Sequence, residues 1–295
     1  MLHDGTAGNR RQALALADAL AVPVCEWILQ PNRLARWAAP RRFPGAGFGG
    51  EFHAALAQTP PALAIGCGRL AALATRQARA AGARVVQILA PRLPTRHWDL
   101  VVAPIHDRLR GNNVVSLLGS LNPVDERWLA LARERWHELL STNGPRTAVL
   151  LGGPTAAVRF DATAFDAMCA RLEGNLAREG GSLLLCASRR TPHEWFETLR
   201  ARFGGGVHRL WLQPRDGENF YAGALACADR VVASPDSVNM LSEACATALP
   251  VFVAEPERAR GRVGDFVQDL LARGRVRPQS RELEPFVGEP LRETA

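Results

Sequence analysis

The stretch Ser234–Ser237, followed by Glu243, has the residue types of an anion-binding helix start. Ser and Asp are favoured N-cap residues, so either Ser234 or Asp236 could begin the helix. The first N–H groups of a helix lack internal acceptors and lie at the positive end of its dipole. We therefore expect Asp236 and the Ser237 and Val238 amides to lie near a phosphate. Glu243, one to two turns further on, could accept hydrogen bonds from a ribose.

Three more loops of the second half follow predicted strands and carry groups that suit a nucleoside diphosphate. Paired glycines let a backbone approach a phosphate closely, and an arginine supplies a charged fork. In a doubly wound sheet, such loops gather around one crevice. Taken alone, each loop is more simply an ordinary turn or a solvated arginine pair. The predicted binding residues in these loops are Gly152, Gly153, Ser188, Arg189, Arg190 and Asn219.

The candidate general bases that we consider lie in loops of the first half. Asp4 lies in the glycine-containing turn His3–Asn9, and His106 and Asp107 follow a predicted strand. Histidine and aspartate are common catalytic bases, although a histidine bonded to its own loop is at least as plausible for His106. The chain shows no convincing cluster of acidic metal ligands, so we predict neither a metal site nor a required cofactor.

The elements that must position these loops alternate between strand and helix, which predicts parallel sheets with right-handed crossovers. We expect one domain at 1–140 and a second at 141–295, because the helix predicted over Asn122–Leu140 is broken by Ser141–Pro145. The strands predicted for the first half are Val22–Leu29, Ala62–Ile65, Arg84–Leu89, Leu100–Ala103 and Asn113–Leu117. Those predicted for the second half are Thr147–Leu151, Ser182–Cys186, Val207–Trp211, Val231–Ala233 and Val251–Val253.

The turn at Asp4–Gly8 normally follows a strand, yet only three residues precede it. We therefore expect a first strand that is nearly absent and a gap in the sheet beside it. A start codon assigned too late is the simplest hypothesis, and mass spectrometry of the native N-terminus would test it.

The composition and charge of the chain limit the classes of partner that it could bind. All 36 basic residues of this 295-residue chain are arginine, and the net charge is +7. The arginines are interleaved with acids and only one tyrosine is present, so we expect no nucleic-acid binding. Weak attraction to anionic lipid or phosphorylated ligands fits better. No apolar run reaches the length of a membrane span and no signal peptide is recognisable. We therefore expect a cytoplasmic protein, and peripheral contact with the inner membrane is an open alternative.

The six cysteines include no CxxC pair, and we predict that they are reduced, buried thiols.

Several motifs along nearly the whole chain resemble, in order, the mitochondrial fission ELM-type family, which has many bacterial members. They include Asp4-Gly5…Gly8, Leu151–Pro154, Ser188–Pro192, Gly217–Tyr221 and Asp236–Ala244. The Ser234–Pro250 pattern is also similar to the donor-binding helix of GT-B glycosyltransferases and of sugar-nucleotide 2-epimerases. The resemblance implies an α/β, GT-B-like fold: two Rossmann-like domains with parallel sheets facing a cleft. It departs at Asn9, where many relatives carry His.

Two classes of function compete. The first is a GT-B-type glycosyltransferase that takes a nucleoside diphosphate sugar as substrate and a lipid or cell-envelope glycan as acceptor, with sugar-nucleotide epimerisation as a second enzymatic option. The arginine pair and the Ser237 helix start would stabilise the leaving phosphate. The second is a non-catalytic GT-B-like scaffold that binds a nucleotide sugar or a protein. The Asn9 departure slightly favours the scaffold.

Overall fold

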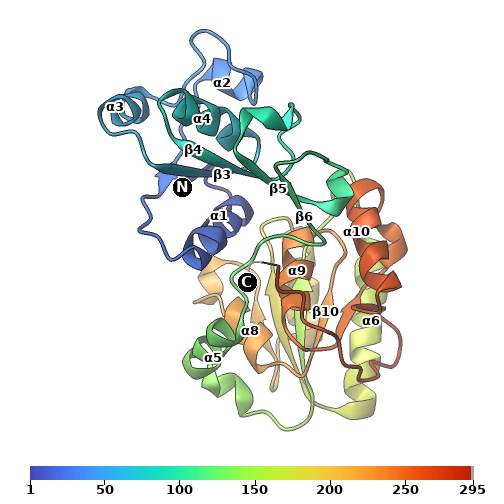
Figure 1. Cartoon of the computed structure of the whole chain (residues 1–295). Helices are drawn as coiled ribbons and strands as arrows, with labels where there is room; N and C mark the ends of the chain where they lie inside the picture. The colour runs from blue at the N-terminus through green and yellow to red at the C-terminus, as the bar shows by residue number, and fades with distance from the viewer. Residues whose placement is uncertain (294–295) are drawn as a thin grey trace. The chain divides into compact units, whose positions relative to one another are not determined.

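A computed structural model of the chain, which describes residues 1–293, shows two compact units (Figure 1). The first comprises residues 1–123 with Glu293, and the second comprises residues 124–292. Each unit is built on its own sheet of six parallel strands, which confirms the predicted α/β class. The division lies earlier than the predicted boundary at 140–141. In place of the predicted long helix, the structure has a shorter helix α5 (Glu126–Arg135) followed by a 3-10 turn (His137–Leu140). Helix α5 belongs to the second unit, because its Arg133 donates two hydrogen bonds to the carbonyl oxygen of Ala226.

The sheet of the first unit has the order β2-β1-β3-β4-β5-β6. Its strands are β1 (Leu2–His3), β2 (Trp27–Ile28), β3 (Leu63–Cys67), β4 (Arg84–Ile88), β5 (Leu100–Pro104) and β6 (Val114–Leu117). Helix α1 (Ala7–Ala19) packs on one face, and α2 (Arg33–Ala38), α3 (Gly50–Gln58) and α4 (Arg69–Ala80) lie on the other (Figure 1). The core on the α4 side is rich in alanine, which lets α4 lie close to the strands.

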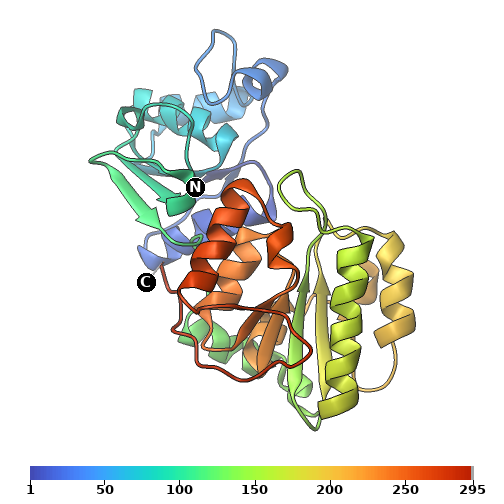
Figure 2. The ribbon, with the colours of Figure 1, turned by 90° about the vertical axis from the view of Figure 1, so that its right-hand side faces the viewer.

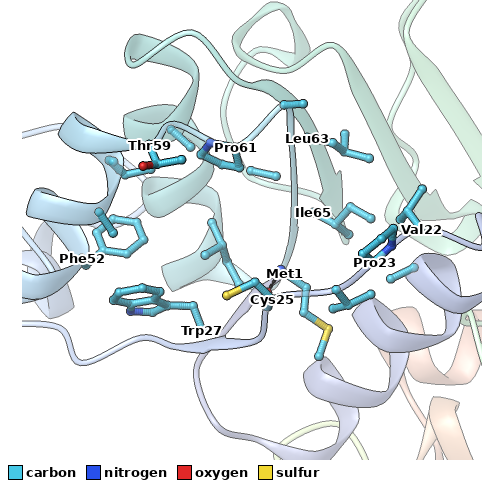
Figure 3. Close-up of a pocket in the computed structure, with 18 residues that line it drawn as sticks. Met1, Val22, Pro23, Cys25, Trp27, Phe52, Thr59, Pro61, Leu63 and Ile65 are labelled. Atoms are coloured by element: carbon cyan, nitrogen blue, oxygen red, sulfur yellow. Dashed lines mark hydrogen bonds between the residues drawn. The ribbon is translucent and has the colours of Figure 1, made fainter.

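The first strand is present but short, as expected. Leu2 pairs with Gly66 of β3, so Leu63–Ile65 have no strand partner on that side in the described chain. The strand predicted over Val22–Leu29 is also shorter, because only Trp27 and Ile28 find a partner in β1. The expected gap is an apolar cavity of about 550 Å³ (Figure 3). Side chains from β3, α3 and the segment before β2 surround it, among them Ile65, Phe52 and Pro23.

The second unit has the strand order β12-β11-β10-β7-β8-β9. Its strands are β7 (Arg146–Leu151), β8 (Ser182–Ala187), β9 (Arg209–Trp211), β10 (Arg230–Ala233), β11 (Val251–Val253) and β12 (Arg277–Pro278). Its other helices are α6 (Ala162–Glu179), α7 (Glu194–Phe203), α8 (Tyr221–Cys227), α9 (Val238–Ala246) and α10 (Gly261–Ala272). The strands predicted for this half are confirmed, with ends that differ by one or two residues.

Helices α6 and α7 pack against one face of the second sheet, where Phe165 and Trp195 stack with ring centroids 4.4 Å apart. The long α6 and its neighbour α7 are seen beside the strands in Figure 2. Strands β7, β8 and β10 are buried almost throughout, as parallel strands covered on both faces must be. Among the described residues, no helix has both the length and the hydropathy needed to cross a bilayer.

Candidate crevice at the switch point of the second sheet

The chain order reverses between β7 and β10 in the second sheet. From β7 the chain proceeds through β8 to β9 on one side, then returns to β10 and continues to β12 on the other. Ligands of open α/β sheets bind beside the carboxyl ends of strands at such a switch point. The loops after β10, β7 and β8 are neighbours there, because those strands are adjacent in the sheet. The structure therefore brings together three of the four predicted binding loops.

A hydrogen-bonded network joins these three loops. The backbone N–H of Gly152 donates to Ser234 Oγ at 2.7 Å, and this hydroxyl donates to Asp236 Oδ1 at 2.6 Å. Arg190 contacts the other carboxylate oxygen, with Nε at 3.1 Å and Nη2 at 2.6 Å from Asp236 Oδ2. The side chain of Asp236 is 0% exposed, whereas that of Arg190 is 46% exposed. The carboxylate of Asp236, a predicted binding residue, is enclosed by protein and positions Arg190 and Ser234.

The paired glycines allow the loops to approach each other. A Cβ atom at Gly152 would lie 1.9 Å from Asp236 Oδ1, and one at Gly153 would lie 2.1 Å from the carbonyl oxygen of Arg190. Real Cβ atoms do not come so close to other atoms. We had expected these glycines for the approach of a phosphate. The structure gives them a different role, namely close packing between neighbouring loops.

The two arginines of the β8 loop have different surroundings. Arg190 is held by Asp236, and its backbone N–H donates to Ser188 Oγ at 3.1 Å. Arg189 is exposed. The turn is closed by Thr191, whose hydroxyl donates to the carbonyl oxygen of Leu151 at 2.9 Å. Both arginines are exposed, but Arg190 is held by its ion pair with Asp236, beside the loops after β7 and β10.

Helix α9 begins beside this network. Its N-cap is Ser237, whose hydroxyl accepts from the N–H of Met240 at 3.3 Å, and the helix runs from Val238. Glu243 is only 2% exposed, so it is not a surface glutamate. Its Oε2 accepts a hydrogen bond from the hydroxyl of Tyr221 at 2.5 Å.

Asn219 follows the more distant β9 and lies just before α8. Its Oδ1 accepts from the backbone N–H of Tyr221 at 2.9 Å. Asn219 thus fixes the residue whose hydroxyl reaches Glu243. Among the predicted residues, Asn219 has the least direct relation to the network of Arg190 and Asp236.

In the first unit, Asp4 lies at the carboxyl end of β1. Asp4 Oδ1 accepts from the N–H and the hydroxyl of Thr6, at 3.1 and 2.7 Å, and from Asn9 Nδ2 at 3.0 Å. Burial alone would raise the pKa of Asp4, but these hydrogen bonds outweigh it and the pKa lies below its ordinary value. Asp4 is therefore a charged acceptor at neutral pH rather than a strong base. It lines an open cavity together with Arg36 and Arg69.

His106 and Asp107 lie elsewhere along the carboxyl edge of the first sheet. They lie in the 3-10 turn Ile105–Asp107 after β5, where His106 is buried and Asp107 Oδ2 accepts from the N–H of Ala90 at 3.3 Å. Two strands separate β5 from β1, which places the two strand ends about 14 Å apart at ordinary strand spacing. The structure does not bring Asp4 into one group with His106 and Asp107.

Sequence reasoning missed three residues that hold the crevice together. Ser234 was considered only as a helix cap, yet its hydroxyl joins the loops after β7 and β10. Thr191 closes the β8 turn, and Tyr221, the only tyrosine of the chain, reaches Glu243. A buried hydroxyl directly after a strand is a signal that could have identified Ser234. The contact between Tyr221 and Glu243 had no local signal.

The two units, each built on a sheet of six parallel strands, have a GT-B-like fold. Over 96% of this chain, the fold is similar to a UDP-GlcNAc 2-epimerase from Methanocaldococcus jannaschii, with a TM-score of 0.57, 12% identity and 89% of that chain covered. It is also similar to MurG from Acinetobacter baumannii, with a TM-score of 0.50, 14% identity, and 95% and 84% of the two chains covered. At these identities the comparisons show the fold alone.

The chain belongs to the mitochondrial fission ELM1 family, whose model matches residues 7–295. It is 28% identical to the mitochondrial fission protein ELM1 of Arabidopsis thaliana over 244 residues, which are 74% of this chain. That match spans only 57% of the length of the plant protein. The chain is also 23% identical to the uncharacterized protein RP120 of Rickettsia prowazekii, over 87% of this chain and 82% of that protein.

Proposed function

We propose that the second unit binds a nucleoside diphosphate sugar at the crevice between the ends of β7, β8 and β10. The observation that carries this proposal is the fixed position of Arg190 beside the start of α9. Arg has five N–H donors, and Asp236 engages Nε and Nη2 only. The remaining donors, with the N-terminal amides of α9, form a suitable receptor for a diphosphate.

Glu243 suits the sugar end of the nucleoside. It follows Ser237 by six residues, which is about 9 Å along the helix at 1.5 Å per residue. Helical side chains lean towards the N-terminus, so the carboxylate would approach a ribose attached to a diphosphate at the helix start. Tyr221 holds one carboxylate oxygen at 2.5 Å and orients the group.

The reaction that we propose is glycosyl transfer of the GT-B type, in which the crevice stabilises the departing diphosphate and the first unit receives the acceptor. Asp4, which Thr6 and Asn9 hold in place through Oδ1, would orient an acceptor hydroxyl. A lipid or glycan acceptor is proposed on the likeness in fold to MurG. Epimerisation is the enzymatic alternative that the second fold neighbour suggests.

A non-catalytic nucleotide-sugar receptor is the second candidate, and the surroundings of Asn9 favour it. The Asn9 amide donates to Asp4, and its Oδ1 lies 3.6 Å from the Sγ of Cys67. Neither Asn9 nor the low-pKa Asp4 is a good general base. The same crevice would then bind its ligand without turnover.

The test is a calorimetric titration of the full chain with UDP, GDP, ADP and CMP sugars, followed by product analysis. Binding of one nucleoside diphosphate sugar that is weakened by Arg190→Ala supports the crevice. Release of nucleoside diphosphate with an acceptor indicates a transferase, an altered sugar indicates an epimerase, and stable binding without change indicates a receptor. Absence of binding to every nucleotide sugar contradicts the proposal.

A further inference from the structure

Helix α2 and the loop after it carry large apolar side chains that face outward. Trp37 is 74% exposed, Phe43 is 49% exposed and Leu34 is 42% exposed. The rings of Trp37 and Phe43 meet edge to face with centroids 5.9 Å apart. These three side chains, with the exposed Arg33, Arg41 and Arg42, are called the Trp37 surface below. The loop lies next to α4 (Figure 1).

The charge around these apolar groups has one sign. No Asp or Glu occurs between Glu26 and Glu51, whereas four arginines do. Burial lowers the pKa of the neighbouring Arg76, and the positive charge of Arg42 lowers it further. The positive charge continues beyond Glu51, because residues 52–98 contain six arginines and no Asp or Glu, whereas the second half of the chain mixes arginines with acids. Exposed apolar groups within a cationic rim are typical of an interaction site for an anionic partner.

The inner side of the segment is anchored, so the aromatic rings are held outward. Ala35 and Phe48 are buried in the core of the first unit. Two side chains of α4 bind carbonyl oxygens of the loop: Arg76 Nη1 donates to Pro40 at 2.8 Å and Gln77 Nε2 donates to Ala46 at 3.0 Å. At the start of the segment, the side chain of Asn32 caps helix α2 by accepting from the N–H of Ala35 at 2.8 Å.

We propose that the Trp37 surface docks on a bilayer that contains anionic phospholipid. Tryptophan and phenylalanine rings are favoured at the boundary between lipid headgroups and acyl chains. An aliphatic group such as Leu34 gains free energy by burial in acyl chains, whereas nucleic-acid bases stack on aromatic rings instead. The surrounding arginines contact lipid phosphates, and each basic residue near such a membrane adds about fivefold to its affinity. The proposal does not depend on the function proposed for the second unit.

The test is co-sedimentation of the full chain with sucrose-loaded vesicles. One set contains phosphatidylcholine alone, and the other contains phosphatidylcholine with about one third phosphatidylglycerol. We expect binding to the anionic vesicles only, decreasing with salt. A Trp37→Ala/Phe43→Ala variant should bind at least tenfold more weakly, and Arg33→Gln/Arg41→Gln/Arg42→Gln should lose about a hundredfold, because three contributions of about fivefold are removed.

Matched controls distinguish local docking from general charge. Leu131 is 58% exposed in the second unit, so Leu131→Ala removes an exposed apolar group from another surface. Arg209→Gln/Arg215→Gln/Arg273→Gln removes the same charge from exposed positions elsewhere. Both control variants should sediment like the wild type. Circular dichroism melting curves of all variants show whether each is folded.

A second readout reports on Trp37 itself. Lipids brominated on the acyl chain should quench part of the tryptophan emission of the wild type, and the Trp37→Phe variant should bind with that part of the quenching lost. Absence of binding to anionic vesicles, equal loss in the control variants, or unchanged quenching in Trp37→Phe would each overturn the proposal. Binding to a DNA oligonucleotide or to a protein without binding to vesicles would also overturn it.

Discussion

Replacing Gly152 with alanine tests the packing of the three crevice loops directly. The added Cβ would lie 1.9 Å from Oδ1, 2.2 Å from Oδ2 and 2.3 Å from Cγ of Asp236. The carboxylate would have to move, although it is fully buried and bonded to Ser234 and Arg190. The backbone of Gly152 does not require a positive φ, so the effect would be steric rather than conformational.

The expected cost follows from the bonds that the displaced carboxylate would lose. A hydrogen bond to a charged group contributes about 1.5–3 kcal/mol, and Arg190 is half exposed, so its ion pair with Asp236 is partly screened. Loss of the bond to Ser234, together with weakening of the ion pair, predicts that Gly152→Ala lowers the free energy of unfolding by about 2–4 kcal/mol. This is large for a substitution that adds one methyl group.

A double-mutant cycle in urea isolates the contact. Asp236→Ala removes the atoms that the new methyl group would strike, so Gly152→Ala should cost less than about 1 kcal/mol in that background. Gly174→Ala is the matched control, because Gly174 is at an exposed position of helix α6 and no atom lies within 4 Å of its added Cβ. This substitution should stabilise the protein by about 0.5–1 kcal/mol. An equal cost of Gly152→Ala with and without Asp236 would refute the reasoning.

Three further outcomes are expected. In calorimetric titrations with a nucleoside diphosphate, Arg190→Ala should weaken binding by about 1.5–3 kcal/mol and the exposed Arg189→Ala should weaken it less; the reverse order would contradict the position of Arg190 at the crevice. Hydrogen bonds from Arg10 and His3 lower the pKa of Glu26 to about 2, so this carboxylate contributes stability above about pH 4.5 that is lost as pH falls towards 2; the destabilisation caused by Arg10→Ala, measured by urea unfolding, should shrink over that range. In the native protein a thiol reagent should modify Cys25 rapidly and the five buried cysteines slowly, and Cys25→Ser should abolish the fast phase.

The repeating strand–loop–helix pattern was sufficient to predict five of the six strands of the second sheet, and only the two-residue β12 was missed. Its strands are continuous apolar runs, and the sheet buries them on both faces, so periodicity and burial agree. The boundary between the units was predicted too far along the chain. The helix-breaking residues Ser141–Pro145 can be recognised in the local sequence, whereas the packing of α5 on α8 cannot. Strand ends in the first unit depend on the length of the partner strand, which explains why only Trp27 and Ile28 form β2.

The loop positions predicted correctly that the loops after β7, β8 and β10 lie together, but the roles of several residues in them were not accessible from sequence. Adjacency of β10, β7 and β8 follows from topology, and topology follows from chain order only once the switch point is known. Sequence spacing could not show that the carboxylate of Asp236 is enclosed or that Gly152 makes room for it. Such roles arise from contacts across 46 to 84 positions of the chain, which no local pattern encodes.

The ion pair of Arg190 and Asp236 has opposing effects on anion binding. The carboxylate neutralises one positive charge, which weakens long-range attraction for a phosphate. However, it also holds the guanidinium in one orientation before any ligand arrives, and ordering a long side chain on binding costs about 0.5–1.5 kcal/mol. The ion pair therefore weakens the attraction of the Arg190 guanidinium for anions in general but increases its selectivity for anions of the right geometry. This arrangement favours a ligand whose phosphate oxygens match fixed donors over any anion that is merely nearby.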